Sequence, residues 1–339
     1  MGIPAIQAAR IGTYILKQRL SGKRRFPLVL MLEPLFRCNL RCKGCGKVTY
    51  PREILERQLS KDECLAAAEE CGAPVVSIPG GEPLLHPDIP GVVEGLAGQR
   101  RFIYLCTNAQ LLAARLDEFQ PTPYLSFNVH LDGLRERHDT QVCKAGAFDR
   151  AVSAVREALR RGFRVTTNTT FFKGQSPEDA AALFDTLMAL GVEGMTVSAA
   201  FSYEAATDQG GFMSRQDTVD LFRAIFSLGR GRGWRFNHSS LYLDFLAGLE
   251  DYPCSPWGTP ARSVLGWQRP CYLLEDGHVS TYRELMEETD WDRYGRGHDP
   301  RCGNCMVHCG YEPTAVADAA HRPLKAWRSS RQPVEARAG

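Results

Sequence analysis

The stretch LVLMLEPLFRCNLRCKGC, residues 28–45, joins an apolar run to three closely spaced cysteines. The run at 28–33 has the composition of a buried strand. Cys38, Cys42 and Cys45 follow it with the spacing C-x3-C-x2-C and without a fourth cysteine beside them. Thiolates at this density favour zinc or an iron–sulfur cluster, and structural zinc normally takes four protein ligands. We therefore expect a 4Fe–4S cluster with one iron left open for another ligand.

The alternation of apolar runs and helical patterns along the chain predicts the fold. Strand-like runs occur at 28–33, 75–79, 102–107, 124–131, 164–171 and 194–199. Helical patterns separate them near 60–71, 88–98, 110–118, 148–161, 177–190 and 216–230. Such β/α units in series predict an α/β protein whose parallel sheet curves into a full or partial barrel. In barrels of this kind the active site lies at the C-terminal ends of the strands.

The totals restrict the class of protein. The 339 residues are 44% hydrophobic and 24% charged, as in globular proteins with a sizeable core, and the net charge of +2 does not favour a nucleic-acid partner. Twelve cysteines are many, but the N-terminus lacks the apolar core of a signal peptide. We therefore expect a reducing cytoplasm and thiolates used for metal. The chain has no uninterrupted apolar run long enough to span a membrane.

The composition changes along the chain, and we expect four parts. Residues 1–26 hold an amphipathic helix and a basic segment, and residues 27–240 form the partial barrel. Residues 241–325 crowd cysteines, prolines and aromatic residues into a small, irregular extension. Residues 326–339 have the composition of a disordered tail.

The first helix, expected at residues 4–20, has two interpretations. Its apolar arc on a 3.6-residue period consists of Ala5, Ala8, Ile11, Ile15, Leu16 and Leu20. The basic residues Lys23, Arg24 and Arg25 follow it. The helix can rest on anionic lipid at a membrane surface. It can equally pack on the barrel, with its charges merely solvated.

A second motif gives the cysteines a context. The run VVSIPGGEP ends in Gly80, Gly81, Glu82 and Pro83, directly after the second expected strand. CxxxCxxC after the first strand and GGEP after the second resemble the radical S-adenosylmethionine (SAM) superfamily, over residues 28–237. The resemblance implies a partial (β/α)6 barrel in which the open iron chelates the amino and carboxylate groups of SAM. It also implies that the two glycines let the backbone approach the SAM amino group.

Polar residues at the other strand ends are further candidates for cofactor binding. They are Thr107, Asn108, Asn128, His130, Asp132, Asn168 and Ser198. His130 stands where many members of the superfamily have a serine that contacts the ribose of SAM. The resemblance therefore does not imply this contact for His130. Alternatively, each of these side chains only hydrogen-bonds to the backbone at its strand end and binds no cofactor.

The C-terminal cysteines form a second group. Cys254 and Cys271 belong to a C-x11-G-x4-C segment, and Cys302, Cys305 and Cys309 follow. This pattern resembles the auxiliary-cluster domains called SPASM or twitch. The group can hold a second iron–sulfur cluster, a structural zinc ion, or free thiols only.

Longer strings carry a closer resemblance. YLCTNA, HLDGL, GWQRPCYLL, LMEETDWDRYG and CMVHCGYE are similar to the adenosylhopane synthases of hopanoid biosynthesis. The resemblance implies that a 5′-deoxyadenosyl radical adds to the exocyclic alkene of diploptene. It also implies an electron donor such as flavodoxin or ferredoxin, and a location at the inner face of the membrane, because a triterpene cannot diffuse through water.

Quenching of the tertiary radical formed by this addition requires a hydrogen donor. Cys106 is the only cysteine outside the two groups that lies at an expected strand end facing the site. We hypothesise that it is this donor, and the alternative is a small buried hydrophobic residue. Tyr252, Trp257 and Trp267 are candidates for lining a hydrocarbon slot, or ordinary core residues.

Two other functions remain open. Auxiliary-cluster members of the superfamily often modify peptides, so a peptide-modifying maturase is one alternative. A non-catalytic iron–sulfur or zinc scaffold is the other, and it predicts no SAM cleavage on reduction.

Overall fold

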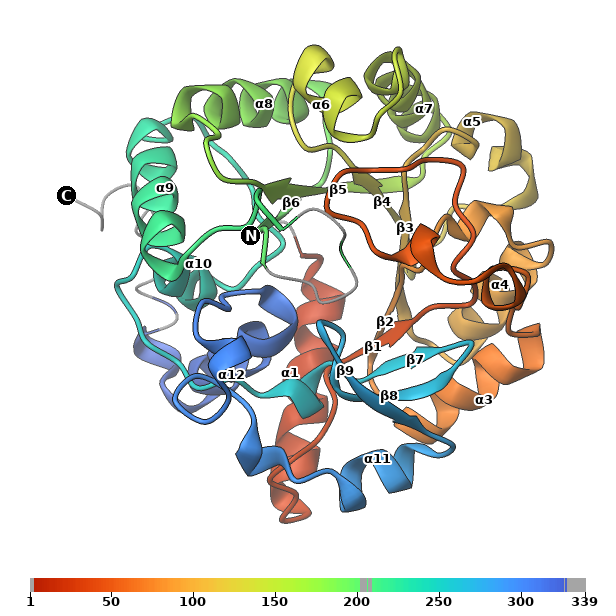
Figure 1. Cartoon of the computed structure of the whole chain (residues 1–339), viewed down its shortest axis with the longest axis vertical. Coiled ribbons are helices and arrows are strands. Elements are labelled where there is room, and N and C mark those ends of the chain that lie inside the picture. The colour runs from red at the N-terminus through yellow and green to blue at the C-terminus, as the bar shows by residue number, and fades with distance from the viewer. Residues whose placement is uncertain (1–2, 202–205, 207–208, 326, 328–339) are drawn as a thin grey trace.

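The computed structural model describes residues 3–201, 206, 209–325 and 327. Within them, six parallel strands follow one another in the sheet in sequence order. Their bounds are β1 (Val29–Leu32), β2 (Val75–Ile78), β3 (Phe102–Thr107), β4 (Leu125–His130), β5 (Arg164–Phe171) and β6 (Met195–Ala199). The predicted α/β fold with a partial barrel is confirmed (Figure 1).

Helices cover the outer face of these strands (Figure 1). They are α3 (Lys61–Cys71), α4 (Ile89–Gly98), α5 (Leu112–Arg115), α7 (Ala147–Arg160), α8 (Pro177–Leu190) and α9 (Arg215–Leu228). Two shorter helices, α2 (Arg52–Leu55) and α6 (Arg135–Gln141), were not predicted. A capping box starts α3, since the Ser60 hydroxyl accepts from the Glu63 N–H and the Glu63 carboxylate accepts from the Ser60 N–H. Gly191 ends α8 with a φ of 85°, which favours glycine.

The C-terminal extension is more regular than predicted. β7 (Ala261–Ser263) pairs in parallel with β1, and β8 (Gly266–Cys271) and β9 (Leu274–Val279) continue the same sheet in antiparallel fashion. Three helices complete the extension: α10 (Ser240–Leu246), α11 (Tyr282–Glu288) and α12 (His308–His321). The expectation of an irregular module was wrong. Its strands are three or six residues long, which is too short to show a clear period.

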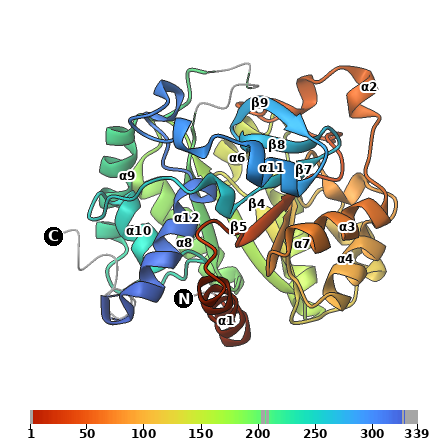
Figure 2. The ribbon, with the colours of Figure 1, turned by 90° about the horizontal axis from the view of Figure 1, so that it is seen from below.

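The N-terminal helix α1 (Ala5–Leu20) lies at the end of the barrel where the strands begin (Figure 2). The buried Gln7 side chain hydrogen-bonds the Tyr104 hydroxyl of β3 at 3.0 Å. Ile15 is buried, but Leu16 and Leu20 are exposed, so the predicted apolar arc does not pack as one face. No helix among the described residues is long and apolar enough to cross a membrane. The predicted tail lies, except for Trp327, outside the described residues.

Candidate active site

The three N-terminal cysteines lie in the loop that follows β1. The loop is anchored on α6, because Lys43 and Gln141 exchange hydrogen bonds of 2.8 and 3.0 Å. The Asn108 amide, at the end of β3, lies 3.7 Å from the Cys38 sulfur. Burial raises the pKa of Cys38 to about 11, and it raises that of Cys42 further. Binding of iron by these thiols must therefore release protons.

Gly80 and Gly81 allow the end of β2 to approach the cysteine loop. A Cβ atom on Gly80 would lie 2.5 Å from the Leu35 carbonyl oxygen, and one on Gly81 would lie 2.0 Å from that of Arg37. The N–H groups of Gly81 and Glu82 donate to these same carbonyls at 3.0 and 2.8 Å. The glycines thus have a structural role that the sequence analysis missed: they hold the GGEP turn against the segment that leads to Cys38.

Glu82 ties the end of β2 to the end of β3. Its buried carboxylate accepts hydrogen bonds from the Leu84 N–H at 3.0 Å, the Thr107 hydroxyl at 2.8 Å and the Asn108 N–H at 2.8 Å. Burial raises the pKa of Glu82 to about 7, against the effect of these donors. Glu82 does not line the cavity described below, so its carboxylate is placed to position Asn108 rather than to touch a cofactor.

A cavity of about 340 Å³ opens at the C-terminal ends of the strands. The other candidates from the barrel all line it, and the five C-terminal cysteines do not. The lining candidates are Cys38, Cys42, Cys45, Gly80, Gly81, Cys106, Thr107, Asn108, Asn128, His130, Asp132, Asn168 and Ser198. They come from six successive β/α units, and the parallel sheet brings their strand ends to one edge. These residues therefore share one cavity, and their binding of a cofactor stays a prediction.

His130 and Asp132 form an ion pair in this cavity. The His130 Nε2 atom lies 2.7 Å from the Asp132 carboxylate, whose other oxygen accepts from the Thr170 N–H at 2.8 Å. Burial opposes protonation of His130, but the carboxylate outweighs it and raises the pKa. Behind them, the buried His138 accepts from the Asp132 N–H at 3.3 Å, and burial lowers its pKa to about 4. The Asp132 carboxylate thus favours the protonated form of His130.

The C-terminal extension supplies residues that the sequence analysis did not assign to the site. His308 lies at the start of α12. Its Nδ1 atom is 2.7 Å from the Ser198 hydroxyl of β6. Tyr272, Leu273 and Val307 also line the cavity. Each of these residues is a neighbour, within two positions, of one of the C-terminal cysteines. Their closeness in sequence to these cysteines was the signal that could have identified them. The sequence alone does not show that the extension folds over the cavity.

Lys47 is a second unpredicted lining residue. It is 2% exposed and pairs at 3.0 Å with Glu33, which is fully buried at the end of β1. Its ammonium lies 4.6 Å from the centre of the Phe36 ring and 4.8 Å from that of Tyr272. Buried ion pairs persist where the surrounding structure fixes their geometry. This pair places a fixed cation beside the cysteine loop.

The cavity has an apolar side. Phe172, Phe201, Phe212, Tyr272, Leu273 and Val307 line it together with the polar strand ends. The predicted hydrocarbon slot was placed wrongly, since Tyr252, Trp257 and Trp267 lie outside this cavity. Trp267 is 1% exposed and packs on Tyr282, and the Tyr252 hydroxyl donates to Asp318.

Cys106 points into the barrel from β3, in register with Asn128 of β4. Its sulfur lies 3.4 Å from the Ser77 hydroxyl and 3.6 Å from the Asn128 amide. Burial raises the pKa of this thiol, and the two hydrogen bonds only partly oppose the effect. Cys106 therefore keeps its S–H proton at neutral pH.

The five C-terminal cysteines come from three segments and lie near one another. The pKa of Cys254 is raised, and burial is the largest cause. The nearby thiols of Cys305, Cys271, Cys309 and Cys302 raise this pKa further. A Cβ atom on Gly310 would lie 2.6 Å from the Cys254 sulfur. All twelve cysteines are free. Within the described residues, no three Cys, His, Asp or Glu side chains converge as a single metal ion would require.

Comparison with known proteins identifies the barrel. Residues 32–187 match the model of the radical SAM superfamily. Residues 195–329 match a domain of unknown function, DUF3463. The radical SAM match begins at the end of β1 and contains CxxxCxxC and GGEP, so it rests on the same loops that build the cavity.

Relatives differ in how much of the chain they share. A GTP 3′,8-cyclase of Listeria welshimeri is 32% identical over 154 residues, which are 42% of this chain and 45% of that protein. The chain thus spans less than half the length of this relative. Streptococcus suis SuiB has a similar fold over 88% of this chain and 71% of its own, at 19% identity and a TM-score of 0.64. A structure named anSMEcpe, with bound AdoMet and a peptide, covers 89% of this chain and 98% of its own, at 14% identity and a TM-score of 0.57. The closer resemblance to adenosylhopane synthases stays a prediction.

The residues present fit the cofactors of the superfamily, a 4Fe–4S cluster and SAM. Cys38, Cys42 and Cys45 would hold the cluster, since three thiols in one loop leave one iron open. The polar side chains at the neighbouring strand ends would hold SAM: Asn128, His130, Asp132, Asn168 and Ser198. This pair of cofactors supplies radical chemistry.

Proposed function

We propose that this chain joins the 5′-deoxyadenosyl group of SAM to the exocyclic alkene of diploptene and so forms adenosylhopane. The proposal starts from the sequence strings shared with that family. Two features of the cavity support it: an apolar wall made by its aromatic and aliphatic lining residues, and a single protonated thiol, Cys106, among the lining residues outside the cysteine loop.

The apolar wall suits a hydrocarbon better than a peptide backbone, which would need hydrogen-bonding partners. Phe201, Phe212 and Val307 offer no such partners in their side chains. A cavity of about 340 Å³ is near the small end of ligand pockets, about 300–1,000 Å³. The reacting end of a triterpene would enter it, and the ring system would extend past the phenylalanines toward the mouth.

When bound, the cluster and SAM supply a 5′-deoxyadenosyl radical. Such a radical would add through C5′ to the alkene: the π bond would break, a C–C bond would form, and a tertiary carbon radical would remain on the triterpene. Cys106 then supplies a hydrogen atom: its S–H bond breaks, a C–H bond forms, and a thiyl radical remains. An electron from the reductant and a proton restore the thiol. The observation that carries this step is the half-buried, protonated Cys106 in the barrel interior.

A peptide-modifying maturase is the second candidate, and the comparisons with known proteins favour it over the first. The observation in its favour is the fold likeness that extends through the C-terminal part to SuiB, which has been solved with its precursor peptide SuiA. The five neighbouring C-terminal cysteines also suit the auxiliary cluster that such a maturase carries. This candidate predicts that the apolar wall receives a peptide side chain.

Anaerobic assays with defined substrates separate the two candidates. The reconstituted protein is reduced with flavodoxin or dithionite and given SAM with diploptene in detergent. A matched reaction contains hopane, which lacks the alkene, and a third contains a peptide library. Mass spectrometry follows 5′-deoxyadenosine and an adenosine–triterpene adduct.

The expected result is an adduct with diploptene and none with hopane. SAM cleavage without an adduct would contradict the triterpene proposal and retain the radical chemistry. A modified peptide would establish the second candidate instead. Absence of SAM cleavage under all conditions would contradict both.

A further inference from the structure

The first helix leaves an apolar ridge in solvent. Ile6, Leu16 and Leu20 are 56%, 58% and 81% exposed, although Gln7 and Ile15 on the same helix are buried against the body of the protein. The spacing of Leu16 and Leu20 places them one turn apart on one side of α1. Leu324, just beyond α12, is 72% exposed. Large exposed apolar side chains are costly in water unless something covers them.

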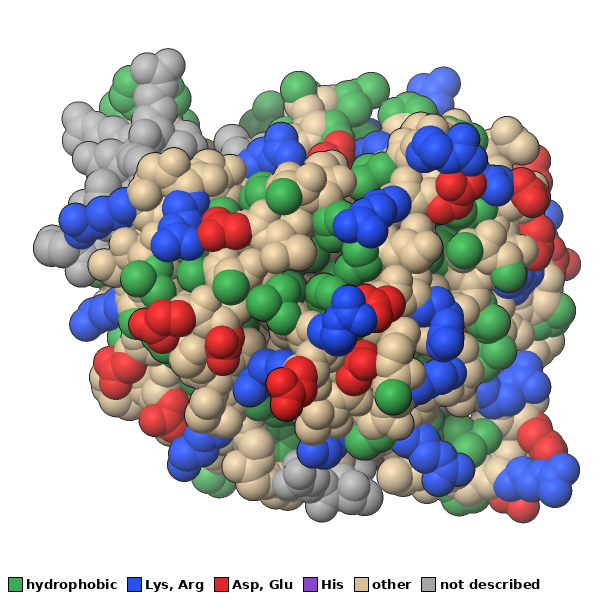
Figure 3. All heavy atoms as spheres, turned by 90° about the horizontal axis from the view of Figure 1, so that it is seen from above, with side chains coloured by type: hydrophobic (Ala, Val, Ile, Leu, Met, Phe, Trp, Pro, Cys, Tyr) green, Lys and Arg blue, Asp and Glu red, His purple; other side chains and the backbone are tan. Residues whose placement is uncertain are grey.

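The same region carries only positive charge. Residues 1–32 contain six lysines and arginines and no acidic residue, whereas the whole chain has a net charge of +2. The remainder of the chain therefore carries −4, since +2 less +6 is −4. On the face shown in Figure 3, basic and acidic side chains are instead intermixed. The positive charge is thus concentrated beside the ridge.

Individual contacts show which of these charges are available. Arg25 pairs with Asp292 at 2.9 Å, and Arg19 donates to the Ala317 carbonyl of α12 at 3.0 Å. Lys17, Lys23 and Arg24 are exposed and make no ion pair with a described residue. They flank the ridge at the C-terminal end of α1, where cations outside an ion pair are best placed to meet an anionic partner.

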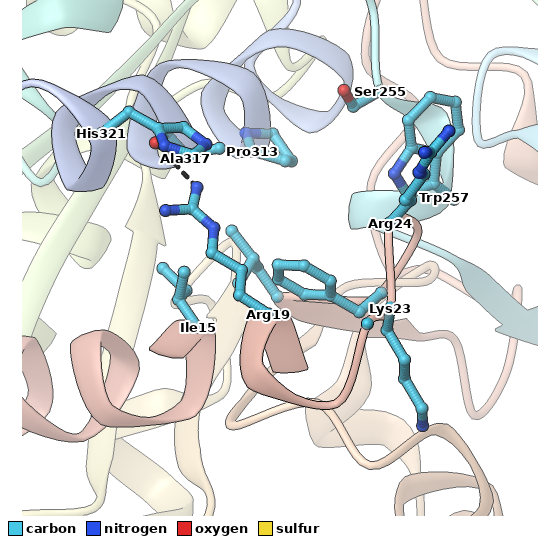
Figure 4. Close-up of a pocket in the computed structure, with 12 residues that line it drawn as sticks. Ile15, Arg19, Lys23, Arg24, Ser255, Trp257, Pro313, Ala317 and His321 are labelled. Carbon is cyan, nitrogen blue, oxygen red and sulfur yellow. Dashed lines mark hydrogen bonds between the residues drawn. The ribbon is translucent and has the colours of Figure 1, made fainter. Parts of the chain in front are cut away.

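A cavity of about 490 Å³ opens between α1, the segment that follows it and α12 (Figure 4). Ile15, Phe26 and Pro313 give it apolar walls. Arg19 reaches toward α12, and Arg24 points toward Trp257 (Figure 4). The combination of apolar walls and cations matches a phospholipid headgroup with the first part of its acyl chains.

We propose that this face docks on a bilayer that contains anionic phospholipid. Leu16 and Leu20 enter the acyl region, Lys17, Lys23 and Arg24 meet lipid phosphates, and the cavity holds one headgroup. Charge complementarity selects this occupant, because a second copy of the same face would bring like charges together. The docking face lies at the end of the barrel opposite the site cavity (Figure 2). Docking therefore stands independently of the proposed reaction.

Vesicle co-sedimentation of the reconstituted full chain tests the proposal. Vesicles contain phosphatidylcholine alone or with phosphatidylglycerol. The variants are L16S/L20S, which removes the ridge, and K23Q/R24Q, which removes two unpaired charges. Matched controls are L134S, at a partly exposed leucine elsewhere, and R57Q/R156Q, which removes the same charge from other exposed positions. Circular dichroism and thermal melts check the fold of each variant.

The wild type is expected to bind vesicles with phosphatidylglycerol and to bind much less to phosphatidylcholine alone. L16S/L20S is expected to lower the partition coefficient at least about tenfold, since burial of two leucines is lost. K23Q/R24Q is expected to lower it by about tenfold and to reduce its salt dependence. The controls should bind as the wild type does, and all variants should cleave SAM at the wild-type rate.

Equal binding of all folded variants, or no binding of the wild type, would overturn the proposal. So would a change of oligomeric state in L16S/L20S without vesicles, because the ridge would then be a contact between copies of the chain. Light scattering of each variant without lipid detects that outcome.

Discussion

The two groups of cysteines are built in opposite ways. Cys38, Cys42 and Cys45 lie within eight residues of one loop, at the ends of strands whose polar side chains face them. The C-terminal group gathers five thiols from β8, from the start of α12 and from loops, over more than fifty residues of sequence. Because of its short spacing, the first group can be predicted from the sequence. The grouping of the second set of thiols depends on how the extension folds.

The surroundings of the two groups differ as well. The N-terminal loop lines an open cavity, with Lys47 and the His130–Asp132 pair close to it. The C-terminal thiols of Cys305 and Cys309 are buried, and burial raises their pKa. A group that lines a cavity can take part in chemistry with a substrate, and a buried one can store electrons or hold the fold. The predictions below test this difference.

Removal of a thiol from the N-terminal group should have the largest effect. Cys42→Ala leaves two ligands, so the cluster is lost and SAM cleavage falls to background. Anaerobic reconstitution followed by measurement of iron and of 5′-deoxyadenosine checks this. Cys143→Ala, at an exposed cysteine near the same loop, is the matched control and should retain full activity. Retained SAM cleavage in Cys42→Ala would contradict the assignment of this loop.

Cys106→Ala should separate the two halves of the reaction. It removes the hydrogen donor and leaves Cys38, Cys42 and Cys45 in place, so SAM cleavage should continue while adenosylhopane falls to background. Cys106→Ser keeps a similar shape with a much stronger O–H bond and should behave the same way. Mass spectrometry of both products checks this. Cys64→Ala, at a cysteine buried on α3, is the control for general packing effects. Normal adduct formation in Cys106→Ser would remove the thiol from the mechanism.

Removal of the C-terminal thiols should have a smaller effect on SAM cleavage. If they hold a second 4Fe–4S cluster, the reconstituted wild type carries about eight iron atoms and Cys302→Ala/Cys305→Ala carries about four. The variant should still cleave SAM, because the N-terminal cluster is intact. Elemental analysis of iron and zinc decides between the alternatives. A fall in zinc alone would identify a zinc site, and unchanged contents of both metals would leave free thiols.

The sequence predicts most of the barrel because its signals are local. Alternating apolar runs, Ser60 with Glu63, and Gly191 each specify their own element, and parallel pairing then brings the strand ends together. The contribution of Tyr272 and His308 was not predictable in this way, because it depends on the pairing of β7 with β1. The same holds for Leu16 and Ile15, which are neighbours in one apolar arc: only the packed structure shows that one is buried and the other exposed.

The smallest predicted effect concerns Glu82, which supports the N-terminal group without lining the cavity. Its pKa is about 7 in the folded protein and about 4.5 in the unfolded chain, so the folded state binds the extra proton between these values. The stability from this group is therefore present below pH 4.5 and lost as the pH rises through 7, by up to about 3 kcal/mol. Thermal melts from pH 5 to 8 should show that the stability of Glu82→Gln rises relative to that of the wild type as the pH rises. Glu63→Gln is the control: hydrogen bonds from the Ser60 N–H and hydroxyl hold the pKa of Glu63 below its usual value, against the effect of burial, so its difference from wild type should stay constant over this range. A constant difference for Glu82→Gln as well would mean that its carboxylate is already ionised at pH 5, held by the Thr107 and Asn108 donors.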